Sequence, residues 1–202
     1  LYDSYIRAIR WATNRIGERG VVAFVTNGSF LDANNMGGLR KCLTEEFSYL
    51  YVFNLRGNAR TQGEERRKEG GGIFDAGSRT PVAVTIMVKD PAHAGPGELR
   101  YHDIGDYLSQ QEKLDIIEGF GSIDAMPWIE LAPNAEGDWA SQRDPAFERF
   151  VPLGEKDESK KSIFEIFTTG VTTARDAWTC SMSRIKLESN VRSMIDVYNI
   201  SR

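Results

Sequence analysis

Cysteine and histidine are scarce in this chain. It has two cysteines, Cys42 and Cys180, and two histidines, His93 and His102. No CxxC pair occurs, so neither a disulfide framework nor a zinc finger is expected, and the cysteine usage indicates a reducing, cytoplasmic compartment. No apolar run approaches the roughly 20 residues of a membrane-spanning helix. We expect both histidines at the surface, which leaves no Ser/His/Asp constellation.

The rest of the composition is that of an ordinary globular protein. Of the 202 residues, 41 % are hydrophobic and 27 % are charged, which excludes a disordered chain and allows one full domain or a small domain with an appendage. Leu1 is already in helical phase with Tyr5, Ala8 and Ala12. We therefore expect the chain to begin inside a helix and to be a fragment of a longer protein.

Charge is distributed unevenly along the chain, whose net charge is −4. Residues 103–138 contain nine acidic residues and a single lysine, Lys113. Such a segment repels phosphates, and the acids lack the spacing of a metal-binding loop. No metal site is expected, and any contact with nucleic acid is expected in the first half of the chain or in its last 60 or so residues.

The hydrophobic pattern predicts an α/β layered sheet. Helices are expected over residues 1–17, 36–47, 106–118 and 184–199, and strands over residues 21–26, 49–55, 81–88, 99–104 and 163–167. No helical pattern precedes the strand 81–88, so it is expected to pair with an antiparallel neighbour. The helix 106–118 is expected to turn Leu108, Leu114 and Ile117 inward. Residues 119–161 show little periodicity and are expected to form an irregular connector.

A long polar loop, residues 56–72, allows two interpretations. Its basic residues are Arg56, Arg60, Arg66, Arg67 and Lys68, and its acidic residues are Glu64, Glu65 and Glu69. The cations could contact DNA phosphates, or the loop could be a solvated, self-paired charge run. The glycines at positions 70–72 fit no phosphate-binding motif and are expected to be flexible.

Aromatic residues also fall into two groups. Tyr2, Tyr5 and Trp11 lie on the opening helix and are expected in the core. Phe74 follows three glycines and precedes a strand, so we do not expect its side chain to be buried within a strand. An exposed phenylalanine at a sheet edge can stack against a planar ligand.

Several stretches together resemble one protein family. The segments LYDSYIRAIRWATNRIGERGVVAFVTNGSFL, GLRKCLTEEF and VFNLRGNARTQGEERRKEGGGIF resemble the later half of a γ-type adenine-N6 DNA methyltransferase. The resemblance is to the methyltransferase region of single-polypeptide, Type ISP-like restriction–modification enzymes, which is fused to helicase and nuclease parts. The segment IFEIFTTGVTTARDAWTC, with the helix that follows it, resembles the start of their target-recognition region.

This resemblance implies a fold and a division of the chain. Residues 1–90 are expected to be the C-terminal half of a Rossmann-like, S-adenosylmethionine-dependent methyltransferase domain, a mixed sheet with one antiparallel strand. Residues 91–160 are then an acidic connector, and residues 161–202 the start of the DNA target-recognition region. The family's cofactor loop and its Asn-Pro-Pro-Tyr-type tetrapeptide are absent, and the chain has no Asn-Pro or Pro-Pro dipeptide. No catalytic residue is therefore expected in this chain.

The resemblance also implies roles for individual residues. Leu1 and Tyr5 match the helix that lines the adenine pocket of the cofactor, S-adenosylmethionine. Phe74 matches an aromatic residue that stacks against the flipped base. DNA contacts are implied at Arg56, Asn58, Arg60, Arg66, Arg67, Lys68, Thr173 and Arg175.

Two functions follow from these observations. The main prediction is a fragment of an adenine-N6 DNA methyltransferase, which transfers a methyl group to a flipped adenine and is inactive alone. Its partners would be double-stranded DNA and the remaining domains of the parent: the N-terminal half of the methyltransferase, the helicase and the nuclease. The alternative is a non-catalytic DNA-binding or coupling module of a helicase–nuclease restriction protein.

Overall fold

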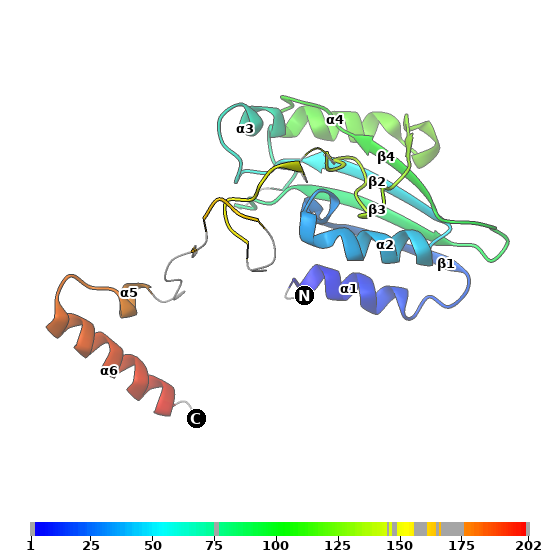
Figure 1. Ribbon diagram of the computed structural model, residues 1–202. Helices are drawn as coiled ribbons and strands as arrows, with labels where there is room; N and C mark the ends of the chain where they lie inside the picture. The colour runs from blue at the N-terminus through cyan, green and yellow to red at the C-terminus, as the bar shows by residue number, and fades with distance from the viewer. Residues whose placement is uncertain are drawn as a thin grey trace. The chain divides into compact units, whose positions relative to one another are not determined.

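A five-stranded mixed sheet organises the first part of the chain (Figure 1). The computed structural model describes residues 3–74, 77–144, 146, 149–155, 161–164, 166 and 176–200. The chain divides into two compact units, residues 1–144 and 145–202. The strands of the first unit are β1 (Gly20–Asn27), β2 (Tyr49–Arg56), β3 (Val82–Lys89), β4 (Glu98–Asp103) and β5 (Ile129–Leu131).

The order of the strands is β1-β3-β2-β4-β5. Strand β3 lies between β1 and β2 and is antiparallel to both, which confirms the antiparallel pairing expected for residues 81–88. Strand β4 runs parallel to β2, and β5 is antiparallel to β4. Because β2 and β4 are parallel, their carboxyl ends meet at one edge of the sheet.

Helices cover both faces of this sheet (Figure 1). Helices α1 (Ser4–Thr13) and α2 (Gly37–Glu46) lie on one face, where Ile9, Leu43, Leu50 and Met87 belong to the larger apolar core. Helix α4 (Gln110–Phe120) lies on the other face, over a smaller core of Phe53, Leu55, Ile73, Val82 and Ile104. The short 3-10 helices are η1 (Gly28–Leu31), η2 (Asn34–Met36) and η3 (Ile123–Ala125).

The polar loop contains a helix that the sequence analysis did not predict, α3 (Gly63–Glu69). Its first turn carries two glutamates and its last turn three basic residues, an order that complements the helix dipole. The helix ends at Gly70, whose φ is +65°. A Cβ at this position would lie 2.1 Å from the carbonyl oxygen of Leu108, so only glycine fits there.

Residues 119–161 are also more regular than expected. Strand β5 falls in this segment, and the Trp139 side chain is buried, with its ring edge-on to that of Phe30 at 6.1 Å. The segment is held by contacts with residues far away in the sequence, and such contacts produce no periodic pattern of apolar residues. Whether positions 90 and 160 separate functional parts of the chain stays a prediction.

Helix α4 begins later than predicted, because Ser109 and Glu112 form a capping box at its start. The side of the helix that faces the sheet therefore differs from the predicted one. Leu114, expected to point inward, is 40 % exposed, whereas Lys113 is fully buried. Leu108 and Ile117 pack against the smaller core, as expected.

The second unit is described only in part. Helix α6 (Arg184–Ile200) confirms the helix expected over 184–199, and a short α5 (Asp176–Thr179) precedes it. The strand expected over 163–167 is wrong where it can be checked, since Ile163, Phe164 and Ile166 are not in a strand; positions 165 and 167 lie outside the described residues. None of the helices that the structure describes is both long and apolar enough to cross a membrane.

Candidate nucleic-acid interface

Arg56 ends strand β2 beside the end of β4. Its Nε atom lies 2.6 Å from Oδ1 of Asp103, and its Nη1 atom is bonded to Asp106. Burial lowers the pKa of Arg56, but the hydrogen bond and charge of Asp103 outweigh it, so the pKa is raised. The guanidinium group predicted to contact DNA is therefore already held by two carboxylates, and a phosphate would have to compete with them.

The backbone of the polar loop is anchored at both ends. The buried Lys113 ammonium group donates to the carbonyl oxygens of Leu55, Glu69 and Gly71, at 2.8–2.9 Å. The Glu69 carboxylate in turn accepts from the backbone N–H of Asn58 at 2.8 Å. The segment is thus a fixed platform, contrary to the flexibility expected of its glycines. Lys113 was missed by the sequence analysis as a residue of this site, although it is the single cation in an acidic segment.

The cations on α3 are partly self-paired. Arg67 lies 3.5 Å from Glu64, and Lys68 lies 3.8 Å from Glu65. Both pairs are on the surface, where such pairs contribute little, so that a phosphate can displace the glutamates. Arg66 instead donates to the carbonyl oxygen of Gly70 at 2.6 Å and helps to end the helix.

The structure adds one residue to the basic set, Arg79. The backbone N–H of Ala59 donates to the carbonyl oxygen of Arg79 at 3.1 Å, and the Arg79 side chain approaches the Ala59 carbonyl at 3.5 Å. This contact places Arg79 beside Arg60, and both residues are exposed. Within the described residues, the guanidinium of Arg60 has no partner. Thr80 and Pro81 separate Arg79 from β3, and no local pattern around Arg79 indicated that it would lie near Arg60.

Phe74 follows the glycines at positions 70–72 and is 55 % exposed. The preceding residue, Ile73, is buried, and its carbonyl oxygen accepts a hydrogen bond of 3.0 Å from Gln110. The ring of Phe74 is therefore outside the core, on a backbone that is held in place. Its role in base stacking stays a prediction.

Of the remaining predicted site residues, the structure describes Tyr5. Leu1, Thr173 and Arg175 lie outside the described residues. Tyr5 is half-buried with its ring 6.3 Å from that of Phe30, and burial, followed by the charge of Asp3, raises its pKa. Tyr5 thus serves the core, and alone it does not form a pocket for S-adenosylmethionine, which stays a prediction. In the described part of the chain, no cluster of His, Cys, Asp and Glu side chains could hold a metal ion.

Comparison with protein families gives one match. Residues 162–202 match the Type ISP C-terminal specificity domain. Among proteins of curated function, none matches the chain.

Solved structures match over almost the whole chain. A nuclease-deletion mutant of the Type ISP restriction–modification enzyme LlaGI, in complex with a DNA substrate mimic, is 47 % identical with a TM-score of 0.82. The ATP-dependent Type ISP restriction–modification enzyme LlaBIII bound to DNA is 39 % identical with a TM-score of 0.85. The DrdV–DNA complex is 34 % identical with a TM-score of 0.81. Each match covers 98 % of this chain but only 16 %, 13 % and 20 % of the respective relatives.

These findings correct the main functional prediction. The description of the chain as a methyltransferase fragment is wrong, because the matching family model is that of a specificity domain and not of a methyltransferase. The alternative, a non-catalytic DNA-binding module, agrees better with these comparisons. Over nearly its whole length the chain belongs to the Type ISP restriction–modification enzymes, as a segment that extends into their C-terminal specificity domain.

Proposed function

We propose that this chain is a non-catalytic DNA-recognition module of a Type ISP restriction–modification polypeptide. The observation that carries the proposal is the match of residues 162–202 to the C-terminal specificity domain. The three similar structures are complexes with DNA or with a DNA mimic, which supports duplex DNA as the partner.

In this proposal the sheet of residues 20–131 is a scaffold. The insertion of β3 between β1 and β2, antiparallel to both, supports a Rossmann-like ancestry for it. The longer protein would supply the enzymatic activities, adenine methylation with S-adenosylmethionine included, from its other domains. This chain would contribute positioning on DNA.

Phosphate contacts are the first task of such a module, because they set the register and orientation of a protein on the duplex. Arg60 lies on the loop that Lys113 fixes from the interior, and Arg79, which is also exposed, lies beside Arg60. Arg67 and Lys68 on α3 lie in weak surface pairs. We infer that these four cations form the backbone-contacting surface of the first unit.

The test is the affinity of the 202-residue chain for fluorescent duplex DNA, measured by anisotropy over a range of salt concentrations. Replacing Arg60 or Arg79 by Gln is expected to remove one phosphate contact each, which flattens the logarithmic salt slope by about 0.9. Arg15→Gln is the matched control, because Arg15 is stacked over Trp11 on the distant helix α1. Wild-type protein without salt-dependent binding, or an equal effect of Arg15→Gln, would contradict the proposal.

A second measurement tests the non-catalytic part of the proposal. The chain is incubated with duplex DNA and labelled S-adenosylmethionine, and transfer of the label to DNA is measured. No transfer above background is expected. Reproducible transfer by a pure preparation would show that the chain itself carries a methyltransferase site.

A further inference from the structure

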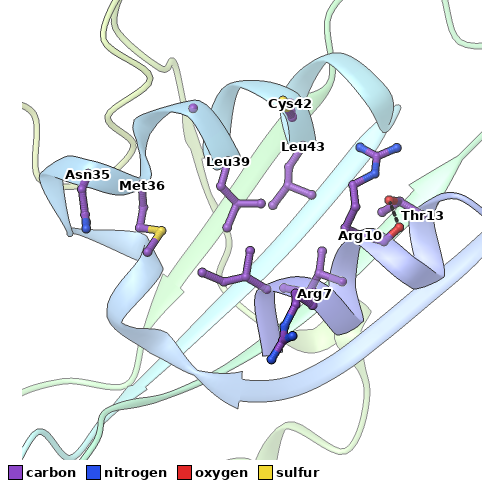
Figure 2. A pocket seen from close by; sticks show the side chains of 11 residues that line it. Arg7, Arg10, Thr13, Asn35, Met36, Leu39, Cys42 and Leu43 are labelled. Carbon is purple, nitrogen blue, oxygen red and sulfur yellow. Dashed lines mark hydrogen bonds between the residues drawn. The ribbon is translucent and has the colours of Figure 1, made fainter. Parts of the chain in front are cut away.

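An open groove lies between helices α1 and α2 (Figure 2). None of the four cations proposed to contact DNA lines it. Its volume is about 450 Å³. Ile6, Ile9 and Leu43 form its floor and are buried. Leu39 extends from α2 toward α1, and Met36 lies at one end (Figure 2). The groove is large enough for several apolar side chains and offers them an apolar floor.

Gly38 is an exposed glycine of α2. It lines the groove, and a Cβ built at this position meets no atom within 4 Å. Its neighbour Gly37 differs, because a Cβ there would lie 2.5 Å from the carbonyl oxygen of Glu136. A side chain at position 38 therefore has open space beside the groove and displaces no other atom, whereas one at position 37 would displace the chain packed against α2.

The α1 side of the groove is positively charged. Arg7 and Arg10 both line it. Arg10 is bonded to Glu46 on α2 and to Asn14, whereas the exposed Arg7 guanidinium has no partner among the residues that the structure describes. Further along α1 the guanidinium of Arg15 lies over the exposed Trp11 ring, 4.0 Å from its centroid. An occupant of the groove thus meets an apolar floor with an unpaired cation at its edge.

We propose that this groove docks an acidic amphipathic helix, whose apolar side chains fill it while a carboxylate pairs with Arg7. Helices bind in apolar grooves through side chains spaced i, i+3, i+4 and i+7, which matches a channel between two helices. The charge complementarity selects an acidic helix over a basic one. Duplex DNA fits poorly, since its backbone offers no apolar group to a floor of Ile6, Ile9 and Leu43. This interaction is independent of the proposed DNA contact.

Two synthetic helical peptides test the proposal on the full 202-residue chain. Both carry leucines at i, i+3, i+4 and i+7, flanked in one peptide by glutamates and in the other by lysines. Binding is followed by fluorescence anisotropy and by the alkylation rate of Cys42, which lines the groove. The exposed Cys180 of the second unit is an internal control. The glutamate peptide is expected to slow alkylation of Cys42 by about tenfold and to leave Cys180 unchanged.

Two variants distinguish groove binding from general charge attraction. Gly38→Leu, which adds a large side chain to the lining of the groove, is expected to weaken binding of the glutamate peptide by at least about tenfold at an unchanged melting temperature. Arg7→Glu is expected to reverse the preference in favour of the lysine peptide. Four outcomes would each overturn the proposal. The first three are that the glutamate peptide binds Gly38→Leu as well as wild type, that it binds no better than the lysine peptide, or that it does not bind at all. The fourth is that duplex DNA, and not the peptide, protects Cys42.

Discussion

The Nζ atom of Lys113 lies 2.9 Å from the carbonyl oxygen of Leu55, and the lysine side chain has no exposed surface. The same ammonium group donates to the carbonyl oxygens of Glu69 and Gly71 at 2.8 Å each. One side chain of α4 therefore ties the end of β2 to the end of α3. Because α3 and the loop before it carry the exposed cations, Lys113 positions the candidate interface from the interior.

The first prediction concerns this lysine. Lys113→Met retains most of the side-chain volume but leaves three carbonyl groups without their donor, and each unsatisfied buried group costs about 1–3 kcal/mol. We expect a loss of more than about 2 kcal/mol in the free energy of unfolding, measured by urea denaturation. The control is Leu114→Ala, one position along and 40 % exposed, which is expected to change stability far less. Equal stability of wild type and Lys113→Met would show that the three hydrogen bonds contribute nothing net.

The second prediction is the pH dependence of that contribution. Burial, opposed by the charge of Glu69, lowers the pKa of Lys113 from 10.5 to about 8. Between these two values the unfolded chain binds the proton more than the folded chain does, so the free energy of unfolding rises with pH. Wild type should therefore gain stability relative to Lys113→Met from pH 8 to pH 10.5. Thermal denaturation of both proteins across this range is the measurement, and parallel profiles would contradict the lowered pKa.

The third prediction concerns the buried arginine that anchors the segment around Gly137 and Asp138 to helix α2. Arg40, fully buried on α2, donates to the carbonyl oxygens of Phe30 and Gly137 at 2.7 Å each and pairs with Asp138 at 2.8 Å. Removing one partner of a buried ion pair costs about 3–5 kcal/mol, and the lower end of this range is expected here because Asp138 also pairs with Arg143 at 2.8 Å. Arg40→Met should therefore lower the melting temperature by on the order of 10 °C.

The neighbouring Lys41 supplies the control for this experiment, because it is exposed on the same helix. Lys41→Met should leave the melting temperature nearly unchanged. In Arg40→Met, limited proteolysis should also cleave the segment around Trp139 faster, since this segment loses its anchor. Resistance equal to that of wild type would mean that Trp139 packing alone holds it.

The strands were predictable because each is a continuous apolar run, which burial on both faces favours in β2 and β3, although Val21 and Val25 of β1 are exposed. The segments 21–26, 49–55 and 81–88 correspond to β1, β2 and β3 within one residue or two at each end, and the polar segment without helical periodicity before β3 correctly indicated antiparallel pairing. Helix α3 was missed for the opposite reason. It buries no side chain, so it has no apolar stripe, and only the order of its charges indicates a helix.

The candidate site was predictable only in its composition. The loop 56–72 was singled out for its cations, but their pairing was not readable: Arg56 meets Asp103 and Asp106 because parallel strands end together. Arg79 joins Arg60 through a backbone contact between residues 59 and 79. Contacts of this range depend on the register of the sheet, and no local pattern in the sequence encodes them.

The fourth prediction separates the two neighbours Ile73 and Phe74. Ile73→Ala removes a buried side chain of the smaller core and should cost about 2–4 kcal/mol of stability. Phe74→Ala removes a ring that is 55 % exposed and should cost well under half of that. If the ring stacks on nucleic acid, Phe74→Ala should nevertheless weaken binding by about 1–3 kcal/mol, while Phe74→Trp keeps the affinity. Melting temperature and DNA affinity are measured on the same preparations. A large stability loss in Phe74→Ala with unchanged affinity would assign the ring to packing and contradict its role in base stacking.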